Sequence, residues 1–460
     1  MIFDNFKRFK KRIALISQDN KKITYGDIIK FKESLKNQFK KRSLTILISD
    51  NSSESIMIYV SLVILKIPIL LLNQTIRSND LKLLIKKFNV QKIFLTNKSD
   101  FKNISEFKKT FIATKFRLLV KKNLKNIKIN KKIMILLPTS GTMSESKLIK
   151  LSYENYLSNT KSIIKYLNLN KSDRTITTLP ISYSYGLSII NTHLMRGASI
   201  VTGDFSLVEK TFWSSNSLYK PTNINGVPFF YDILSKIGFK KILTKKSKFF
   251  TVAGGKISFN TLKKISENLN FKKISFYLMY GQTEASPRMT YHKLVKSDLK
   301  KNKIPAGQAI DGCKIYLYNK KKQNISKNNL EGEIIFKGPN IFGGYAENSE
   351  DLKFFAKKKY LFTGDLGIFD KKKKLYITGR KSRIAKVYGF RLNLDQLESK
   401  LKNKAACIVK NDKLYIFSHK KLNVSNYIDL PNNSFKMIVL NKFPKTDSGK
   451  ISYNKLLLKI

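Results

Sequence analysis

The stretch Pro138–Lys150 reads PTSGTMSESKLIK and lies between two strongly patterned segments. Before it, Ile133–Leu137 is an apolar run that predicts a buried strand, and after it Ser152–Tyr166 has the apolar periodicity of a helix. The stretch combines hydroxyl side chains, one glycine and a lysine, which together can surround an anion such as a phosphate. Its single glycine excludes the P-loop pattern. A polar surface loop fits these residues equally well, so the surrounding sequence decides.

Size and composition indicate a folded protein with more than one domain. The chain has 460 residues, and 42% of them are hydrophobic and 12% aromatic. This length predicts two or three domains. The two cysteines, Cys313 and Cys407, form neither a disulfide framework nor a metal-binding pattern, and they favour a reducing, cytoplasmic location.

The chain is strongly basic, with a net charge of +58 from 89 Lys and Arg against 31 Asp and Glu. Such a charge suggests nucleic-acid or membrane-surface binding. However, nearly all of the cations are lysines spread along the whole chain, as expected from an AT-rich genome, and arginine, the better bidentate phosphate ligand, is sparse. We therefore expect no dedicated nucleic-acid site, whereas an acidic protein partner or an anionic membrane surface stays an alternative.

No segment has the pattern of a leader or a membrane span. The N-terminal sequence MIFDNFKRFKKRIALI is basic but lacks the long apolar core of a signal peptide. The most apolar run, Ile56–Leu72, contains Lys66 and Pro68 and only just reaches the minimum length of a span. We predict a buried helix that ends near Lys66, followed by a strand, and no transmembrane segment.

Strand and helix patterns alternate through the first two thirds of the chain, which predicts an α/β fold with largely parallel sheets covered by helices. The expected strands are 44–49, 69–72, 92–96, 133–137, 175–179, 199–202, 223–227, 249–252 and 274–279. The expected helices are 25–39, 53–65, 80–88, 152–166 and 187–195. The lysine-rich residues 101–130 predict a surface connector with one strand near 111–113. Several strands end in small or polar residues, and ligands of open α/β sheets bind at such ends.

From Ile304 onward the pattern changes to turns and short strands, which predicts a β-rich subdomain. Its expected strands are 315–318, 332–336, 364–369 and 375–377. The final segment of roughly 80 residues has the size of a small mobile lid. We therefore expect a large N-terminal domain, residues 1–380, and a small α+β C-terminal domain, residues 381–460.

A series of short motifs follows in order along essentially the whole chain. The motifs are Thr139–Lys147, Leu179–Leu187 (LPISYSYGL), Tyr280–Glu284 (YGQTE), Gly338–Tyr345 (GPNIFGGY), Thr363–Asp365 (TGD), Gly379–Arg380 with Lys386–Arg391 (GR…KVYGFR) and Pro444–Lys450 (PKTDSGK). Together they resemble one family, the adenylate-forming acyl-CoA synthetase-like enzymes, also called AMP-binding enzymes. An early Thr24–Tyr25 pair fits the same family.

The resemblance implies an enzyme that uses ATP and Mg²⁺ to convert a small carboxylic acid into an acyl-adenylate, with release of pyrophosphate. The acyl group then passes to a thiol, either CoA or the phosphopantetheine arm of an acyl carrier protein. Carrier proteins are typically acidic, so the basic composition is compatible with such a partner.

The resemblance also assigns residues to the nucleotide. Thr283 would donate to the α-phosphate, Glu284 would ligate Mg²⁺, and Asp365 would accept the ribose hydroxyls with Arg380 nearby. The phosphate loop would consist of Thr139, Ser140, Gly141, Thr142 and Lys147, and the adenine site of Gly254, Gly255, Lys256, Tyr280 and Gly281.

Lys450 is the predicted catalytic residue of the first half-reaction, because an ammonium placed between a carboxylate and a phosphate offsets their repulsion in the transition state. The family's C-terminal domain rotates between the half-reactions, here about a hinge at Lys381 or Ser382. After rotation the segment around Val387–Arg391 would face the site, and Gly389 would leave room for the pantetheine arm.

The phosphate loop departs from the family pattern TSGTTGxPKG at Met143, Ser144, Ser146 and Leu148. These changes predict weaker pyrophosphate binding or a stiffer loop. They also motivate an alternative function, a non-catalytic binding or scaffold protein that has kept the fold. The intact Glu284 position argues for activity.

The substrate expectation rests on the acyl pocket. Family members that select amino acids carry an aspartate for the α-amine where this chain has Ser184, which argues against an α-amino acid. Aromatic and small residues are expected to line the pocket and favour an apolar acyl or aryl carboxylate, such as a fatty acid or an aryl acid. They are Tyr183, Tyr185, Gly226, Val227 and Pro228, with Gly281.

Overall fold

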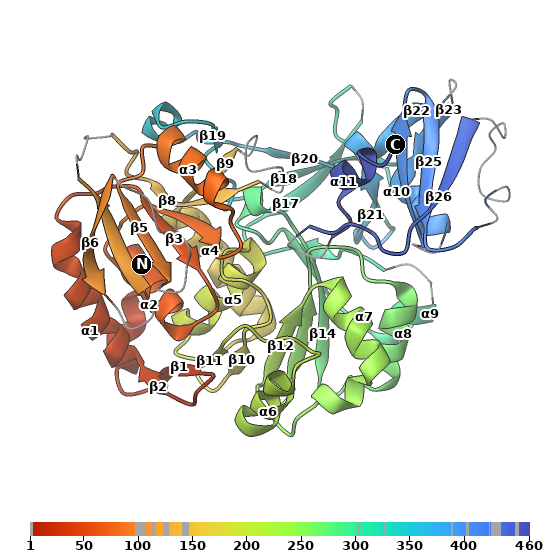
Figure 1. Cartoon of the computed structure of the whole chain (residues 1–460). Helices are drawn as coiled ribbons and strands as arrows, with labels where there is room; N and C mark the ends of the chain where they lie inside the picture. The colour runs from red at the N-terminus through yellow and green to blue at the C-terminus, as the bar shows by residue number, and fades with distance from the viewer. Residues whose placement is uncertain are drawn as a thin grey trace.

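The computed structural model describes residues 3–96, 106–112, 116–122, 128–139, 147–300, 304–319, 321–325, 327–387, 390–401, 404–422, 424, 434–446 and 450–460. These residues form two large sheets with helices, a smaller antiparallel sheet and a C-terminal α+β part (Figure 1). The predicted α/β class is confirmed.

The first large sheet has eight strands among the described residues, in the order β19-β9-β8-β4-β3-β5-β7-β6. Its centre is parallel, because β3 pairs in parallel with β4 and β5, and β4 with β8. The strands are β3 Thr45–Ser49, β4 Ile69–Asn73, β5 Lys92–Thr96, β6 Phe107–Ile112, β7 Phe116–Lys121, β8 Ile133–Pro138, β9 Leu148–Ser152 and β19 Tyr345–Ala346.

The second large sheet has nine strands over the same part of the chain, in the order β16-β15-β14-β13-β12-β10-β11-β1-β2. The pairs from β14 to β1 are parallel, whereas β2, β15 and β16 add antiparallel edges. The strands are β1 Ile13–Ser17, β2 Lys22–Thr24, β10 Arg174–Ile176, β11 Ser199–Thr202, β12 Asn223–Gly226, β13 Phe249–Val252, β14 Ser275–Tyr280, β15 Thr290–Lys293 and β16 Gln308–Ala309.

Helices lie between the two sheets and on their outer faces. The largest apolar core joins Leu71 of one sheet, Ile200 of the other and Leu187 of a helix between them. The inner helices are α1 Tyr25–Lys36, α2 Ser53–Ile64, α4 Tyr153–Leu167 and α5 Ser184–Met195. The others are α3 Ser78–Lys87, α6 Lys210–Tyr219, α7 Pro228–Ile237, α8 Phe259–Glu267 and α9 Lys296–Lys300, with short 3-10 turns η1 Asp4–Phe9, η2 Asn37–Phe39, η3 Phe239–Ile242, η4 Thr283–Ala285, η5 Glu350–Lys353 and η6 Lys381–Arg383.

The predicted β-rich segment forms an antiparallel sheet of β17 Lys314–Tyr318, β18 Gly332–Lys337, β20 Leu361–Phe369 and β21 Leu375–Arg380. The remaining chain lies to one side of the molecule (Figure 1). It has apolar cores built from its own residues, including Val387, Leu397 and Cys407. Its elements are β22 Ile384–Val387, β23 Phe390–Asn393, α10 Leu394–Lys400, β24 Ala405–Lys410, β25 Lys413–Ser418, β26 Phe435–Val439 and α11 Tyr453–Leu457.

Two local predictions were wrong. In the described part of residues 101–130, the strand predicted near 111–113 overlaps the end of β6, but the rest is not a connector, because β6 and an unpredicted strand, β7, form a hairpin at a sheet edge. Phe116 and Leu118 are buried and alternate with half-buried neighbours, but the consecutive apolar residues Leu118, Leu119 and Val120 obscured that alternation in the sequence. The end of the stretch Pro138–Lys150 also belongs to a strand, β9. The last residue of β9, Ser152, caps α4, because its side chain accepts from the Asn155 backbone N–H.

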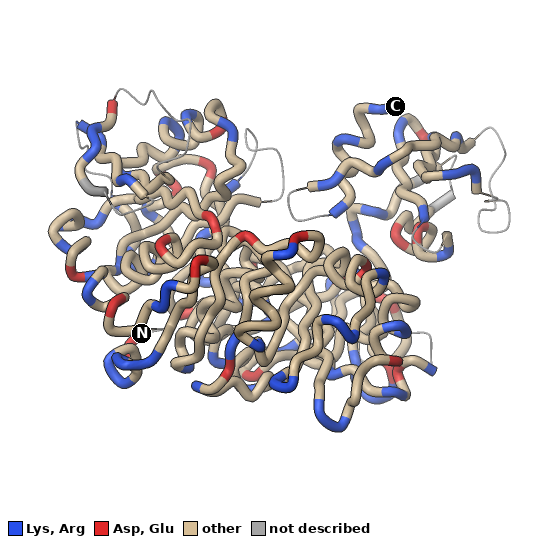
Figure 2. The backbone as a smooth tube through the Cα atoms, turned by 60° about the horizontal axis from the view of Figure 1, so that its bottom comes forward, with Lys and Arg blue, Asp and Glu red and all other residues tan. Residues whose placement is uncertain are grey.

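The apolar run Ile56–Leu72 behaves as predicted, since α2 ends at Ile64 and β4 begins at Ile69. Within the described residues, no helix combines the length and the apolar character needed to cross a bilayer. Lysine and arginine are distributed along the whole tube in Figure 2 rather than gathered on one segment. This distribution matches the compositional interpretation of the charge.

Candidate active site

Asp365 lies at the centre of the site, where three strands from different parts of the chain meet. Asp365 on β20 pairs in register with Arg380 at the end of β21, and the Arg380 Nε donates to its Oδ1 at 2.9 Å. Tyr280, the last residue of β14, donates its hydroxyl to Oδ2 at 2.6 Å. The structure therefore brings together three residues that the sequence assigned to the nucleotide.

The TGD turn fixes the Asp365 carboxylate. Gly364 has a φ of +72°, a conformation that glycine adopts without strain. The Thr363 hydroxyl accepts from the Asp365 backbone N–H at 3.0 Å and donates to the Ile334 carbonyl at 2.7 Å. Burial and the nearby Asp365 charge raise the pKa of Tyr280 far above its usual value, so its hydroxyl stays a donor.

Lys450 reaches this cluster from the C-terminal end of the chain. Burial lowers the pKa of Lys450, the Arg380 charge lowers it further, and Asp365 opposes them. Lys450 as a whole is nevertheless exposed, so its ammonium is only partly shielded from water. A bridge between Lys445 and Ile451 holds the backbone on either side of Lys450. The structure thus places the predicted catalytic lysine within electrostatic range of the predicted ribose site.

Thr283 and Glu284 begin the short turn η4, which two residues separate from the end of β14, and contact two other motifs. The Thr283 and Ser184 hydroxyl oxygens are 3.0 Å apart. Glu284 accepts from the Tyr345 hydroxyl at 3.0 Å, and its carbonyl accepts from the Phe342 N–H at 2.9 Å. The motifs YGQTE, LPISYSYGL and GPNIFGGY therefore form one surface.

The phosphate loop is described only at its two ends. Thr139 donates its backbone N–H to the Lys147 carbonyl at 3.0 Å, and the Lys147 ammonium lies 2.6 Å from a Glu347 carboxylate oxygen. Strand β9, which follows Lys147, pairs with β19, where Tyr345 contacts Glu284. The ends of the loop are thereby tied to the Glu284 segment. Ser140, Gly141 and Thr142 lie outside the described residues, as does Gly389.

The glycine turn after β13 is tightly packed. Gly254 has a φ of +86°, and a Cβ there would lie 2.5 Å from the Tyr183 hydroxyl oxygen. A Cβ on Gly255 would contact Pro228 Cγ at 3.3 Å. Lys256 donates to Ser399 Oγ on α10 at 3.1 Å, and burial lowers its pKa. The turn therefore also contacts the C-terminal part.

At two of the glycines predicted to line the pocket, close packing leaves no room for a side chain. A Cβ on Gly281 would collide with the Pro287 carbonyl oxygen at 1.9 Å, and one on Gly226 would lie 2.7 Å from the Phe230 ring. Val227 precedes α7 and Pro228 is its first residue, in the sterically favoured position for proline.

The sequence did not point to Arg288. It is 2% exposed, and its guanidinium carbon lies 4.7 Å from the centre of the Tyr185 ring. Tyr185 is equally buried, and its hydroxyl lies 2.6 Å from the Thr251 hydroxyl. The available signal was an arginine four residues after Glu284 in a chain whose cations are mostly lysines.

The site offers few acidic side chains for a metal, as expected where Mg²⁺ is held mainly by the phosphates of a nucleotide. Within the described ranges, no three His, Cys, Asp or Glu side chains are grouped as a metal site. Mg²⁺ that accompanies a nucleotide typically uses one or two protein carboxylates plus phosphate oxygens and water. Glu284 is positioned to be such a carboxylate.

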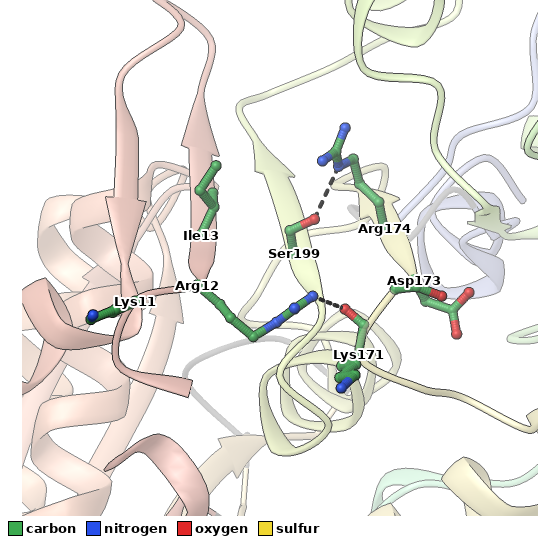
Figure 3. Close-up of a pocket in the computed structure, with 8 residues that line it drawn as sticks. Lys11, Arg12, Ile13, Lys171, Asp173, Arg174 and Ser199 are labelled. Atoms are coloured by element: carbon green, nitrogen blue, oxygen red, sulfur yellow. Dashed lines mark hydrogen bonds between the residues drawn. The ribbon is translucent and has the colours of Figure 1, made fainter. Parts of the chain in front are cut away.

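The cavity in Figure 3, about 340 Å³ in volume, lies elsewhere. Its lining comes from the amino ends of β1, β10 and β11, namely Arg12, Arg174 and Ser199 with their neighbours. Tyr280 and the glycine turns lie at the carboxyl ends of the same sheet. The cavity is therefore separate from the candidate site.

A family model described as "AMP-binding enzyme" matches residues 2–346. A 2-succinylbenzoate–CoA ligase of Bacillus mycoides (strain KBAB4) is 26% identical over 283 residues, 60% of this chain and 55% of that protein. An oxalate–CoA ligase of Arabidopsis thaliana is 29% identical over 252 residues, 54% of this chain and 48% of that protein. The chain thus spans about half the length of the curated relatives it matches.

The fold is similar to that of an o-succinylbenzoate CoA synthetase from Bacillus subtilis. With its complex with the acyl-adenylate intermediate OSB-AMP, the TM-score is 0.80 at 19% identity, over 99% of this chain and 97% of that chain. With its complex with ATP and magnesium ion, the TM-score is 0.78 at 19% identity, over 99% of both chains. The architecture is therefore shared along nearly the whole length.

Proposed function

Because the chain belongs to the AMP-binding enzyme family, we propose that it is an AMP-forming acid–thiol ligase that first converts a carboxylic acid into an acyl-adenylate. One observation carries this proposal: Tyr280, at the carboxyl end of a parallel strand, and Arg380 both donate hydrogen bonds to the Asp365 carboxylate. Lys450 supports it, because the charges of Arg380 and Asp365 both affect its pKa. Relatives named as ligases of 2-succinylbenzoate and oxalate with CoA support the same chemistry.

We assign each residue of the site a separate role in the first step. Asp365, held by Tyr280 and Arg380, would accept the ribose hydroxyls, and Thr283 would donate to the α-phosphate. Glu284 would hold Mg²⁺, which neutralises phosphate charge. The substrate carboxylate oxygen attacks the α-phosphorus, and the bond to pyrophosphate breaks. The Lys450 ammonium would offset the repulsion between these two anions in the transition state.

In the second step a thiol sulfur attacks the acyl carbon and AMP leaves. CoA is the proposed acceptor, and the phosphopantetheine of an acidic carrier protein is the competing one. The proposed rotation divides residues 1–380 from residues 381–460 at Lys381 or Ser382. The separate apolar cores of the C-terminal part support this division. Rotation would break the contacts of Lys256 with Ser399 and of Lys445 with Phe229.

The two cysteines are free, which supports the proposed cytoplasmic location. The scaffold alternative rests on substitutions in the phosphate loop, and residues 140–146 lie outside the described structure.

Carboxylate-dependent exchange of labelled pyrophosphate into ATP tests the proposal across a panel of acids. We expect exchange that requires both an acid and Mg²⁺. Absence of exchange with every acid, in folded protein that still binds ATP, would support the scaffold alternative. Adding CoA, or a carrier protein that bears its pantetheine arm, then identifies the acceptor.

A further inference from the structure

The cavity of Figure 3 lies at the amino edge of the second large sheet, whereas the candidate active site lies at the carboxyl edge. Three neighbouring parallel strands, β10, β11 and β1, begin at this edge. The volume of about 340 Å³ is within the usual range of small-ligand sites. None of the described residues that line it has a role in the proposed reaction, so a ligand bound there would be distinct from the reacting ATP and acid.

The lining of this cavity is strongly basic. Its cations are Lys11, Arg12, Lys171 and Arg174. Asp173 is the only acidic residue among the described residues of the lining, and its carboxylate is already bound by groups outside the cavity. It accepts from the Lys248 ammonium at 2.8 Å and from the Thr222 hydroxyl at 3.0 Å. Asp173 therefore does not neutralise the cations around the cavity.

Uncharged acceptors hold the two guanidinium groups of the lining in place. Arg12 donates from Nη2 to the Lys171 carbonyl. Arg174 donates from Nε to the Ser199 hydroxyl at 3.0 Å and from Nη1 to the Tyr219 carbonyl at 2.8 Å. Figure 3 shows Ser199 between the two arginine side chains. Carbonyl and hydroxyl oxygens orient a guanidinium but leave its charge in place.

The two arginines also lack a compensating charge. In the part of the chain that the structure describes, no acidic side chain forms an ion pair with Arg12 or Arg174. Arg174 is half-buried, and burial lowers its pKa, yet a guanidinium keeps its proton in proteins. Removing a cation from water is costly unless an anion compensates it, so the cavity favours an anionic occupant. Arginine is sparse in this chain, so the general excess of lysine does not explain why two arginines meet here.

We propose that this cavity is a second binding site, separate from the adenylation centre, for a compact polyanion with adjacent phosphate groups. A guanidinium binds phosphate oxygens through paired hydrogen bonds. The two arginines belong to different strand ends, so they suit an anion whose oxygens point in several directions better than a single planar carboxylate. Ile13 is the only apolar side chain among the described lining residues and none is aromatic, so the cavity offers no face for a nucleobase. Pyrophosphate is the simplest ligand of this class.

Calorimetric titration of pyrophosphate tests the proposal in the full-length protein, with the nucleotide site saturated by a non-cleavable ATP analogue. The analogue keeps pyrophosphate out of the adenylation centre, so the remaining binding reports on the cavity. We expect saturable binding whose affinity falls as the salt concentration rises, because exposed charges are screened. Absence of saturable binding at low salt would overturn the inference. Tighter binding of citrate than of pyrophosphate would overturn the assignment to phosphate.

Arg12→Gln and Arg174→Gln supply the second arm, with Arg196→Gln as the matched control. Arg196 is exposed and also donates from Nε to a backbone carbonyl, that of Leu169, but it does not line the cavity. Loss of a hydrogen bond between charged groups should weaken pyrophosphate binding at least about tenfold in each cavity variant and not in Arg196→Gln. Equal weakening in all three variants would show diffuse attraction by a basic surface and would overturn the inference.

The exchange of labelled pyrophosphate into ATP separates this inference from the proposed function. Arg12→Gln should exchange at the wild-type rate, because the cavity is remote from the adenylation centre. Exchange that is lost in Arg12→Gln together with pyrophosphate binding would overturn the claim of a separate site. If Arg174→Gln fails to fold, Arg12→Gln still decides, because it changes an exposed side chain.

Discussion

At the residue scale, the account depends on how Asp365 and Lys450 are held. Asp365 has fixed donors on both carboxylate oxygens, from Tyr280 and Arg380, and so presents its remaining lone pairs in defined directions. The Asp365 charge also acts on Lys450, which forms no ion pair with an acidic side chain in the described part of the chain. An ammonium that is partly desolvated and weakly compensated is suited to bind an anionic transition state.

Lys450→Ala should therefore lower pyrophosphate exchange by about 10²–10³-fold, the usual loss when one preorganised charge is removed. Thioester formation from supplied acyl-adenylate should remain largely intact, because that step uses the other face of the C-terminal part. Lys459→Ala, an exposed lysine near the same end, is the control for charge. Equal loss of both steps would contradict the separate roles of the two conformations.

The pH profile follows from the lowered pKa of Lys450. The ammonium is the active form, so exchange should fall as the pH rises through that pKa, at a lower pH than for an ordinary lysine. Lys450→Arg should shift this alkaline limb upward, because the guanidinium does not lose its proton there. If the alkaline limb of the pH profile is unchanged in Lys450→Arg, another group must cause the fall in activity.

Tyr280→Phe removes one donor to Asp365 and keeps the aromatic ring. The lost hydrogen bond to a charged group corresponds to roughly 1.5–3 kcal/mol, so KM for ATP should rise by about one to two orders of magnitude. Direct ATP-binding measurements check the direction. Tyr376→Phe, whose hydroxyl contacts Asp370 on the same sheet, is the matched control and should bind ATP normally.

At the element scale, the strand ends explain why the motifs work together. The parallel strands β12, β13 and β14 all deliver their last residues to one edge, and β20 and β21 bring Asp365 and Arg380 to the same place. Most of these strands were predictable because each is an apolar run ended by glycine, proline or a polar residue. The two-residue strands β16 and β19 are too short to show any alternation.

The hinge next to β21 gives a prediction at this scale. Lys381→Pro should restrict the backbone where rotation is proposed, leaving exchange within a few-fold of the wild type while lowering overall thioester formation at least about tenfold. Lys381→Ala is the matched control, because both variants lose the ion pair with Glu333. Thioester formation reduced equally in both variants would mean that the ion pair, not the rotation, matters.

At the scale of the whole molecule, the sequence predicted the α/β class and the β-rich segment, and two residues that it assigned to the nucleotide, Tyr280 and Arg380, contact a third, Asp365. It did not predict the β6–β7 hairpin, because Leu119 and Val120 follow Leu118 directly and hide the alternation of the buried Phe116 and Leu118. It also missed Arg288, because a single arginine carries no pattern, and only the structure reveals its burial beside Tyr185. Long-range packing, not local sequence, determines both.

The central claim is that the substrate carboxylate attacks the α-phosphorus of ATP, and isotope transfer tests it most directly. An acid labelled with ¹⁸O in its carboxylate is converted to thioester, and the nucleotide product is examined by mass spectrometry. The account predicts AMP that carries one ¹⁸O atom, because the bridging oxygen of the acyl-adenylate leaves with AMP. ADP together with ¹⁸O-labelled inorganic phosphate would contradict the account, since it would place the attack on the terminal phosphate.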